Sequence, residues 1–167
     1  MLLHGDQVTL RPVTAGDVPA LTRLFAVPEV AAWWPGDNGV RLGALLDAEG
    51  DGVGLVIELD GHLIGFIQYF EETDPQYRHA SIDIVVHPDW CNRGLGTDAV
   101  RTLARHLFDD IGHHRITIDP AVVNARAIAS YRKVGFRDVG VMRRYEQAAD
   151  GIWRDSLLMD LLADELV

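Results

Sequence analysis

The loop Asn92-Arg93-Gly94-Leu95-Gly96-Thr97 constrains the fold of this chain more than any other segment. It joins a strand-like run, Ala80 to Val86, to a helix-like run that ends near Asp109. Its two glycines lack the Cβ atoms that would keep a ligand away from the backbone. The first N–H groups of a helix also point outward, with the positive end of the helix dipole. The loop therefore predicts a strand-loop-helix unit that binds an anion such as a phosphate.

Length and composition favour one domain that spans residues 1–167. A chain of 167 residues with 48% hydrophobic content can bury a core of its own. There is no signal-like N-terminus and no apolar run of about eighteen residues, and Cys91 is the single cysteine, so we expect a soluble, cytoplasmic protein with no membrane partner. A formal charge of −10 disfavours nucleic acid as a partner and favours a cationic one, because nucleic-acid binding relies on cations that neutralise phosphates.

Hydrophobic periodicity predicts a mixed α/β sheet with helices on both faces. Asp60-Gly61 is typical of a tight hairpin turn, and the apolar continuity of Ala80 to Val86 predicts a strand buried on both faces. The expected strands are Val8–Arg11, Leu55–Leu59, His62–Phe70, Ala80–Val86, Arg115–Asp119, Phe136–Met142 and Trp153–Leu162. The expected helices are Val18–Phe25, Val40–Ala48, one from the glycine loop to Asp109 with an apolar stripe at Leu95, Ala99, Leu103 and Leu107, and one from Asn124 to Gly135.

A second signature follows the glycine loop along the chain. It is the run Asn124-Ala125-Arg126-Ala127-Ile128-Ala129-Ser130-Tyr131-Arg132-Lys133-Val134-Gly135-Phe136. With the preceding strand and the R-G-x-G-x loop, this N-x-x-A-x-x-x-Y-x-K-x-G-F run resembles the GNAT family of acyl-CoA-dependent N-acetyltransferases, over most of the chain and in the same order. The resemblance implies a mostly antiparallel mixed sheet of about six to seven strands, with acetyl-CoA as the acyl donor.

The resemblance also implies a set of residues that bind acetyl-CoA. In the family the central strand splays from its neighbour, which leaves backbone N–H groups free for the acyl-thioester and pantetheine. The implied residues are Ile84, Val85 and Val86 on that strand, Asn92, Arg93, Gly94, Leu95, Gly96 and Thr97 in the loop, and Asn124 and Lys133 on the later helix. Asn124 would equally serve as an ordinary helix N-cap. Cys91 stands where the family usually has Gln or Arg, which leaves open whether one diphosphate contact is lost.

Two residues are candidates for proton transfer. Tyr131 matches the family's tyrosine that protonates the leaving thiolate, and the alternative is a ring packed in the core. Asp83 lies within an apolar strand, where a carboxylate is costly unless something pairs with it. It is either the base for the attacking amine or a partly exposed partner of an arginine. Burial would raise its pKa and a bound ammonium would lower it, so the sequence does not fix the net direction.

Several segments narrow the resemblance to the aminoglycoside 6′-N-acetyltransferases. They are Trp33-Trp34, Gly65 to Tyr69, Ile82-Asp83, Asp119-Pro120 and Asn124 to Phe136. In that subfamily the matching aspartates contact ammonium groups of the drug and one is the proposed base, which implies these roles for Asp83 and Asp119. Gln68, Trp33 and Trp34 would be further substrate contacts, although the tryptophans would also suit packing under a loop.

Other site chemistries fit less well. Gly94-x-Gly96-x-x-Ala99, with Asp119 further on, formally matches a dinucleotide fingerprint, but residues 87–93 separate the strand from the first glycine. Cys91 with His87 would make a covalent acyl-enzyme, yet a nucleophilic cysteine needs a lowered pKa and a place beside the acyl group. The histidines show no zinc-ligand spacing, so no metal is expected.

We therefore expect transfer of an acetyl group from acetyl-CoA to a primary amine of a small polycation, specifically the 6′-amino group of an aminoglycoside, by direct attack in a ternary complex. The alternatives are acetylation of a protein N-terminus or of a metabolite or siderophore amine. A non-enzymatic acyl-CoA sensor is a further alternative. The sequence leaves open whether the protein is a monomer or a homodimer.

Overall fold

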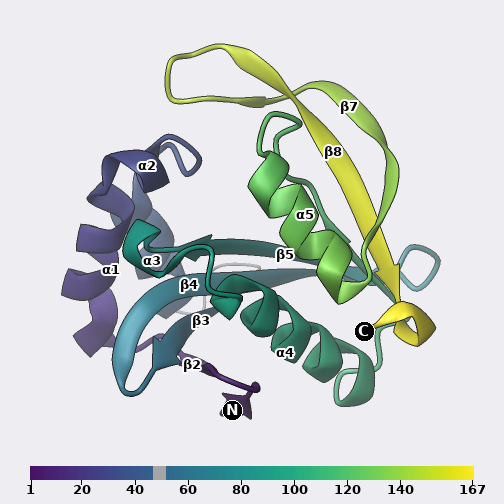
Figure 1. The fold of residues 1–167 in the computed structure, drawn as a ribbon, viewed down its shortest axis with the longest axis horizontal. Helices are drawn as coiled ribbons and strands as arrows, with labels where there is room; N and C mark the ends of the chain where they lie inside the picture. The colour runs from purple at the N-terminus through teal and green to yellow at the C-terminus, as the bar shows by residue number, and fades with distance from the viewer. Residues whose placement is uncertain (47–51) are drawn as a thin grey trace.

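The computed structural model describes residues 1–46 and 52–167, which form one sheet with helices packed against it (Figure 1). The strands are β1 (Leu3–His4), β2 (Thr9–Pro12), β3 (Gly52–Leu59), β4 (His62–Glu72), β5 (His79–Val86), β6 (Arg115–Ile118), β7 (Arg137–Gln147) and β8 (Trp153–Leu162). The helices are α1 (Val18–Ala26), α2 (Pro28–Ala31), α3 (Asn38–Leu46), α4 (Leu95–Asp109) and α5 (Ala125–Val134), with short 3₁₀ turns η1 (Ala15–Asp17), η2 (Pro88–Trp90) and η3 (Ala163–Glu165). The end of the expected helix Val40–Ala48 falls outside the described residues.

Within the described ranges the sheet has 8 strands, in the order β1-β2-β3-β4-β5-β6-β8-β7. The pairs are antiparallel except β5 with β6, which run parallel. The prediction of a mostly antiparallel mixed sheet is therefore confirmed, with one strand more than expected. The extra strand, β1, has only two residues, too few for any alternation of apolar and polar side chains to show in the sequence.

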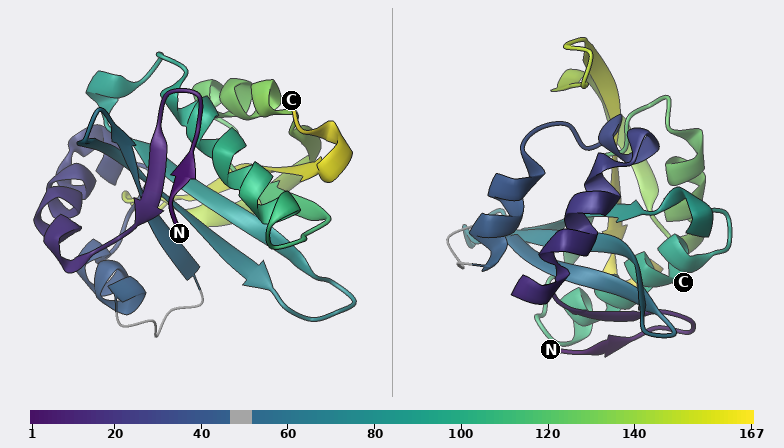
Figure 2. Two further views of the ribbon diagram at one scale, coloured as in Figure 1. Left: turned by 90° about the horizontal axis from the view of Figure 1, so that it is seen from below. Right: turned by 90° about the vertical axis from the view of Figure 1, so that its left-hand side faces the viewer.

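Helices cover both faces of the sheet, as predicted, and each face has its own core (Figure 2). One core packs α4 and α5 against the sheet, and the expected stripe of α4 (Leu95, Ala99, Leu103 and Leu107) is buried in it. The other core packs α1 and α3 around Val56, Phe66 and Val85. Burial of side chains from both faces fixes the register of the central strands, because a slip of one residue would exchange the two faces.

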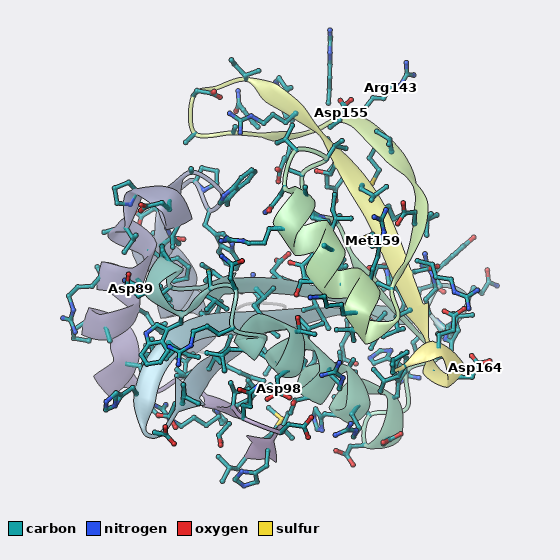
Figure 3. All side chains as sticks on the ribbon, in the orientation of Figure 1. Asp89, Asp98, Arg143, Asp155, Met159 and Asp164 are labelled. Atoms are coloured by element: carbon teal, nitrogen blue, oxygen red, sulfur yellow. The ribbon has the colours of Figure 1, made fainter. Side chains whose placement is uncertain are left out.

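One carboxylate of α4 bonds the segment between β1 and β2. Asp98 is 3% exposed, and its side chain accepts hydrogen bonds from the backbone N–H groups of Asp6, Gln7 and Val8 at 2.8 to 3.0 Å (labelled in Figure 3). These contacts join residues about ninety positions apart. No local pattern in the sequence indicates this anchor, because its two ends lie so far from each other along the chain.

The strands β5 and β6 diverge soon after they meet. They pair only at Ala80 with Ile116 and at Ser81 with Thr117, while β5 continues to Val86. The splay implied by the family resemblance is therefore present. As predicted, β5 packs on both faces, with Ala80 and Ile82 in one core and Val85 in the other, while Asp83, Ile84 and Val86 are only partly buried. The divergence opens the edge of β5 toward α5 and creates the site described below.

Two glycines set the ends of the helices next to this opening. Gly94, with φ of 80°, precedes α4, and Gly135, with φ of 116°, ends α5, as the sequence predicted for Gly135. Both angles lie in the left-handed region that favours glycine. In the described part of the chain, no helix is both long and apolar enough to span a membrane.

Candidate active site

A cavity of about 670 Å³ lies where β5 and β6 part. Every site residue predicted from the sequence lines it except Arg93. The predicted lining residues are Trp33, Trp34, Gln68, Asp83, Ile84, Val85, Val86, Asn92, Gly94, Leu95, Gly96, Thr97, Asp119, Asn124, Tyr131 and Lys133. The structure thus gathers segments from α2 to α5 into one site.

One end of the cavity is the N-terminus of α4. Gly94 is the N-cap, and no side chain of the described residues caps this helix. The N–H groups of Leu95, Gly96 and Thr97 have no acceptor within the helix, because the first turn has no preceding carbonyl groups. A Cβ atom added to Gly96 would lie 3.5 Å from Val86 Cγ2, in the space that the loop leaves open. This end suits a phosphate group, which the helix dipole also favours.

The side chains of Arg93 and Cys91 both make contacts within the protein. The Arg93 guanidinium lies 4.8 Å from the ring centroid of Trp90, in a cation–π contact, and not in the cavity wall. The Cys91 thiol donates to the carbonyl oxygens of Val86 and His87 at 3.6 Å, while His87 Nδ1 accepts the N–H of Asp89. His87 is therefore not positioned as a base for Cys91. A covalent acyl-enzyme on Cys91 has no base in reach in this arrangement.

The open edge of β5 supplies backbone donors. His87 N–H donates to Ile64 on β4 at 2.8 Å. Because N–H groups alternate between the two edges of a strand, the N–H groups of Ile84 and Val86 face the splay, whereas that of Val85 faces β4. Two of the three predicted backbone donors are thus directed to the cavity.

The helix α5 forms the opposite wall. Asn124 accepts the Ala127 N–H at 3.3 Å, so the N-cap role is confirmed and its side-chain NH₂ group is the part left for a ligand. Ser130, which sequence reasoning missed, shares a 2.7 Å hydrogen bond with Thr97 and joins α5 to the first turn of α4. Tyr131 is 8% exposed and lines the cavity. Burial, followed by the charges of Asp83 and Asp119, raises the pKa of the Tyr131 phenol above its ordinary value.

The other end of the cavity is acidic. Asp83 accepts a 3.0 Å hydrogen bond from Gln68 Nε2, directly across the strand pair β4–β5. Asp119 directly follows β6. Burial first and the charge of Asp83 second raise its pKa to about 6, against a hydrogen bond from Tyr145 that lowers it. Glu146 of β7 also lines this end, and burial raises its pKa too. Carboxylates that raise one another's pKa values form a site suited to a positively charged ligand.

The predicted substrate contacts differ in their surroundings. Gln68 is 3% exposed and its amide nitrogen is used by Asp83, so Gln68 orients that carboxylate. Trp34 packs against Phe25 and Phe66, with ring centroids 5.5 and 5.9 Å apart, so it belongs to the core as well as to the cavity wall. Trp33 is 37% exposed and lines the cavity.

Sequence reasoning also missed Glu29, Arg126 and Glu146, all of which line the cavity. Arg126 belongs to the N-x-x-A run, so its place next to Asn124 was available as a signal. Glu29 and Glu146 lie in segments whose local patterns say nothing about what they face.

The arrangement fits acetyl-CoA as the co-substrate. The N-terminus of α4 has no side-chain cap, β5 has an edge that β6 leaves open, and Tyr131 and Asp83 line the same cavity. Such a site would hold a diphosphate at the helix N-terminus and a pantetheine arm along the open strand edge. Among the described residues there is no cluster of three His, Cys, Asp or Glu side chains that would hold a metal ion. The mostly antiparallel sheet and the turn η2 between β5 and Gly94 also differ from a dinucleotide-binding βαβ unit.

Comparison with known proteins agrees with this geometry. A family model described as an acetyltransferase (GNAT) domain matches residues 7–137. The chain is 31% identical over 160 residues to aminoglycoside N(6′)-acetyltransferase type 1 of Klebsiella pneumoniae, which covers 83% of this chain and 78% of that protein. It is 26% identical over 161 residues to spermidine N(1)-acetyltransferase of Escherichia coli (strain K12), which covers 93% and 86%.

Among solved structures, RimJ of Mycobacterium smegmatis in complex with CoA-disulfide superposes with a TM-score of 0.84 at 29% identity, over 99% of this chain and 88% of that one. The family model alone spans more than half of the chain. The chain therefore belongs to the GNAT family and is an acetyl-CoA-dependent N-acetyltransferase.

Proposed function

We propose that this enzyme acetylates a primary amine of a small polycation, and that its acceptor is the 6′-amino group of an aminoglycoside. The observation that carries the proposal is that Asp83, Asp119 and Glu146 line one cavity, close enough for the charge of Asp83 to raise the pKa of the other two carboxyls. Carboxylates held together in a half-buried site are stabilised by cations. The aminoglycoside N(6′)-acetyltransferase of Klebsiella pneumoniae, aligned over 83% of this chain, supports the specific acceptor.

Asp83 is the proposed base. An amine must lose a proton before it attacks a carbonyl carbon, and a carboxylate within reach accepts that proton directly or through one water. Gln68 holds one carboxylate oxygen of Asp83 at 3.0 Å, which fixes the direction of the other. Acetyl-CoA supplies the activated acetyl group as a thioester. The N–H groups of Ile84 and Val86 lie on the edge of β5 that faces this position, where they can stabilise charge on the acyl oxygen.

Tyr131 is the proposed acid. Its raised pKa keeps the phenol protonated throughout the neutral range, so a proton is available for the thiolate that leaves. Asp119 binds a second ammonium group, which fixes the acceptor relative to Asp83. A multiply charged amine held by two or more carboxylates loses much of its freedom before reaction, and this alignment supplies part of the rate.

The test is CoA release from acetyl-CoA with a panel of amines: kanamycin, spermidine and a basic peptide with a free N-terminus. We expect kanamycin to give the highest kcat/KM, with mass spectrometry locating the acetyl group on the 6′-amine. The Asp83→Asn variant should lower kcat at least a hundredfold and leave the Kd of acetyl-CoA within twofold. Equal losses in both quantities would show a folding defect instead, and kcat/KM highest for the peptide would contradict the proposal.

A linear polyamine is the second candidate acceptor. The spermidine N(1)-acetyltransferase of Escherichia coli aligns over 93% of this chain, and an acidic cavity also suits spermidine. The ratio of kcat/KM for kanamycin to that for spermidine distinguishes the two. A protein N-terminus or a metabolite amine has no comparable support from the cavity, because neither requires several carboxylates.

A further inference from the structure

Two hydroxyl groups meet between α4 and α5 at the wall of the cavity. Thr97 Oγ1 and Ser130 Oγ lie 2.7 Å apart, and both residues line the cavity. Thr97 is the third residue of α4, and Ser130 directly precedes Tyr131 on α5. In the described part of the chain, no other hydrogen bond directly joins these two helices. The pair therefore fixes the first turn of α4 against the wall that α5 forms.

The two hydroxyl groups have more protons than they use on each other. A hydroxyl donates one proton and accepts through two lone pairs, so only one of the two protons lies between the oxygens. Hydroxyls within helices commonly donate to the carbonyl oxygen four residues earlier, as Thr22 does at 2.7 Å and Thr102 at 2.8 Å. Among the residues that the structure describes, Thr97 and Ser130 make no such bond. One hydroxyl proton of the pair is therefore left for a ligand in the cavity.

The position of Thr97 decides which hydroxyl keeps that proton when an anion is bound. Thr97 belongs to the first turn of α4, where the N–H groups and the helix dipole favour an anion. If Thr97 donated to Ser130, its lone pairs would face the anion, which is repulsive. If Ser130 donates to Thr97, the Thr97 proton is free for the anion, and each hydrogen bond in such a chain strengthens the next. The second order is the favoured one.

We infer that Ser130 is a positioning residue for acetyl-CoA, whose hydroxyl donates to Thr97 and thereby directs the Thr97 proton to the diphosphate. The inference rests on the start of α4 as the diphosphate site, and it does not depend on which amine is acetylated. Ser130 acts through Thr97 and takes no part in proton transfer. It should therefore affect the affinity for donors that carry the diphosphate and leave the chemical step unchanged.

The first test is a double-mutant cycle in which calorimetry measures the Kd of CoA. We expect Ser130→Ala to raise this Kd about fivefold, as for loss of one neutral hydrogen bond. Thr97→Val should raise it about twentyfold, because a hydrogen bond to a charged group is stronger. The double variant should match Thr97→Val to within about twofold, because a residue that acts through Thr97 has no effect once the Thr97 hydroxyl is gone.

Two further variants control for the chemical change itself. Thr22→Val makes the same exchange of a hydroxyl for a methyl group on α1, at a residue that does not line the cavity, and should leave the Kd of CoA unchanged. Ser130→Thr keeps a hydroxyl group at the position and should return the Kd to within about twofold of the wild-type value. Urea unfolding shows that each variant is folded under the conditions of the calorimetry.

The second test compares acetyl-CoA with S-acetylpantetheine, which carries the same thioester and no diphosphate. The acceptor is whichever amine gives the highest kcat/KM. We expect Ser130→Ala to raise KM for acetyl-CoA about fivefold, with less than about twofold change in kcat or in kcat/KM for S-acetylpantetheine. A displacement of α5 would instead lower turnover with both donors, because Tyr131 lies on the same helix.

The inference is overturned if Ser130→Ala leaves the Kd of CoA unchanged, or raises it by the same factor with and without the Thr97 hydroxyl. Ser130 would then contact the ligand itself or serve the fold alone. Equal losses with the two acyl donors would overturn it as well. Failure of the proposed function looks different, because the amine panel then shows no preference for kanamycin. The cycle with CoA needs no acceptor and still decides the role of Ser130.

Discussion

Replacement of Asp119 by asparagine should stabilise the protein at neutral and alkaline pH. Burial and the neighbouring charge of Asp83 raise the pKa of this carboxyl from 3.8 to about 6. A rise of this size corresponds to about 3 kcal/mol between the two protonation states. The side chain is partly exposed, and solvent screens part of this energy, so we expect a gain of about 1 kcal/mol in the free energy of unfolding at pH 8. The amide introduced by Asp119→Asn retains an oxygen that accepts the Tyr145 hydrogen bond.

The gain should depend on pH in a defined direction. A carboxyl whose pKa is higher in the folded state stabilises the fold fully below its unfolded pKa, and this contribution is lost as pH rises through the folded pKa. The wild type therefore loses stability relative to Asp119→Asn between about pH 4 and pH 6, and the difference should stay constant above about pH 7.

Urea unfolding followed by circular dichroism at pH 4, 6 and 8 measures this difference, with Asp109→Asn as a control for net charge. A variant less stable than the wild type at pH 8, or a difference that is the same at all three pH values, would rule out this explanation. The same variant should bind the polycationic acceptor more weakly, because the carboxylate that costs stability is the one proposed to hold an ammonium group.

Three further predictions concern catalysis and the fold. Tyr131→Phe should lower kcat about a hundredfold or more while the Kd of acetyl-CoA, measured by calorimetry, stays within twofold; unchanged turnover would remove Tyr131 as the acid. Gly135→Ala should lower the free energy of unfolding by about 2 kcal/mol, because φ is 116° and the added Cβ would collide with the Glu165 carbonyl oxygen; thermal denaturation would show no shift if that position tolerated a side chain. Asp98→Ala should cost about 2–4 kcal/mol in urea unfolding, because three backbone N–H groups lose their acceptor, and a loss under 1 kcal/mol would mean that β1 and β2 are held by other contacts.

Local signals explain most of what the sequence predicted. Gly94 and Gly96 mark the start of a helix, Asn124 and Gly135 mark the two ends of another, and Asp60-Gly61 marks a hairpin; each depends on residues a few positions apart. The resemblance of these signals to one family predicts that Asp83, Asp119 and Tyr131 share a site, and all three line the same cavity. Periodicity alone would not have brought these residues together.

The features that the sequence did not reveal depend on distant contacts. The segment between β1 and β2 is held by Asp98, some ninety residues away. The irregular stretch of β7 places Arg144 in a left-handed conformation, although the sequence has neither glycine nor asparagine at this position. The Arg144 N–H donates to Asp155 across the hairpin, a contact that no local pattern indicates. No local pattern therefore marks Glu146 as a site residue. The place of Arg93 in the loop predicts a diphosphate contact, whereas the sequence gives no sign of the cation–π contact that its guanidinium makes with Trp90.

A crystal structure of the enzyme with both CoA and kanamycin would show whether one cavity holds the diphosphate at the start of α4 and the polycation at its acidic end. We expect the diphosphate oxygens to accept hydrogen bonds from the N–H groups of Leu95 to Thr97, and the 6′-amine to lie against Asp83 with further ammonium groups at Asp119 and Glu146. A diphosphate bound away from the start of α4, or a kanamycin molecule whose amines avoid these carboxylates, would show that the site is used differently.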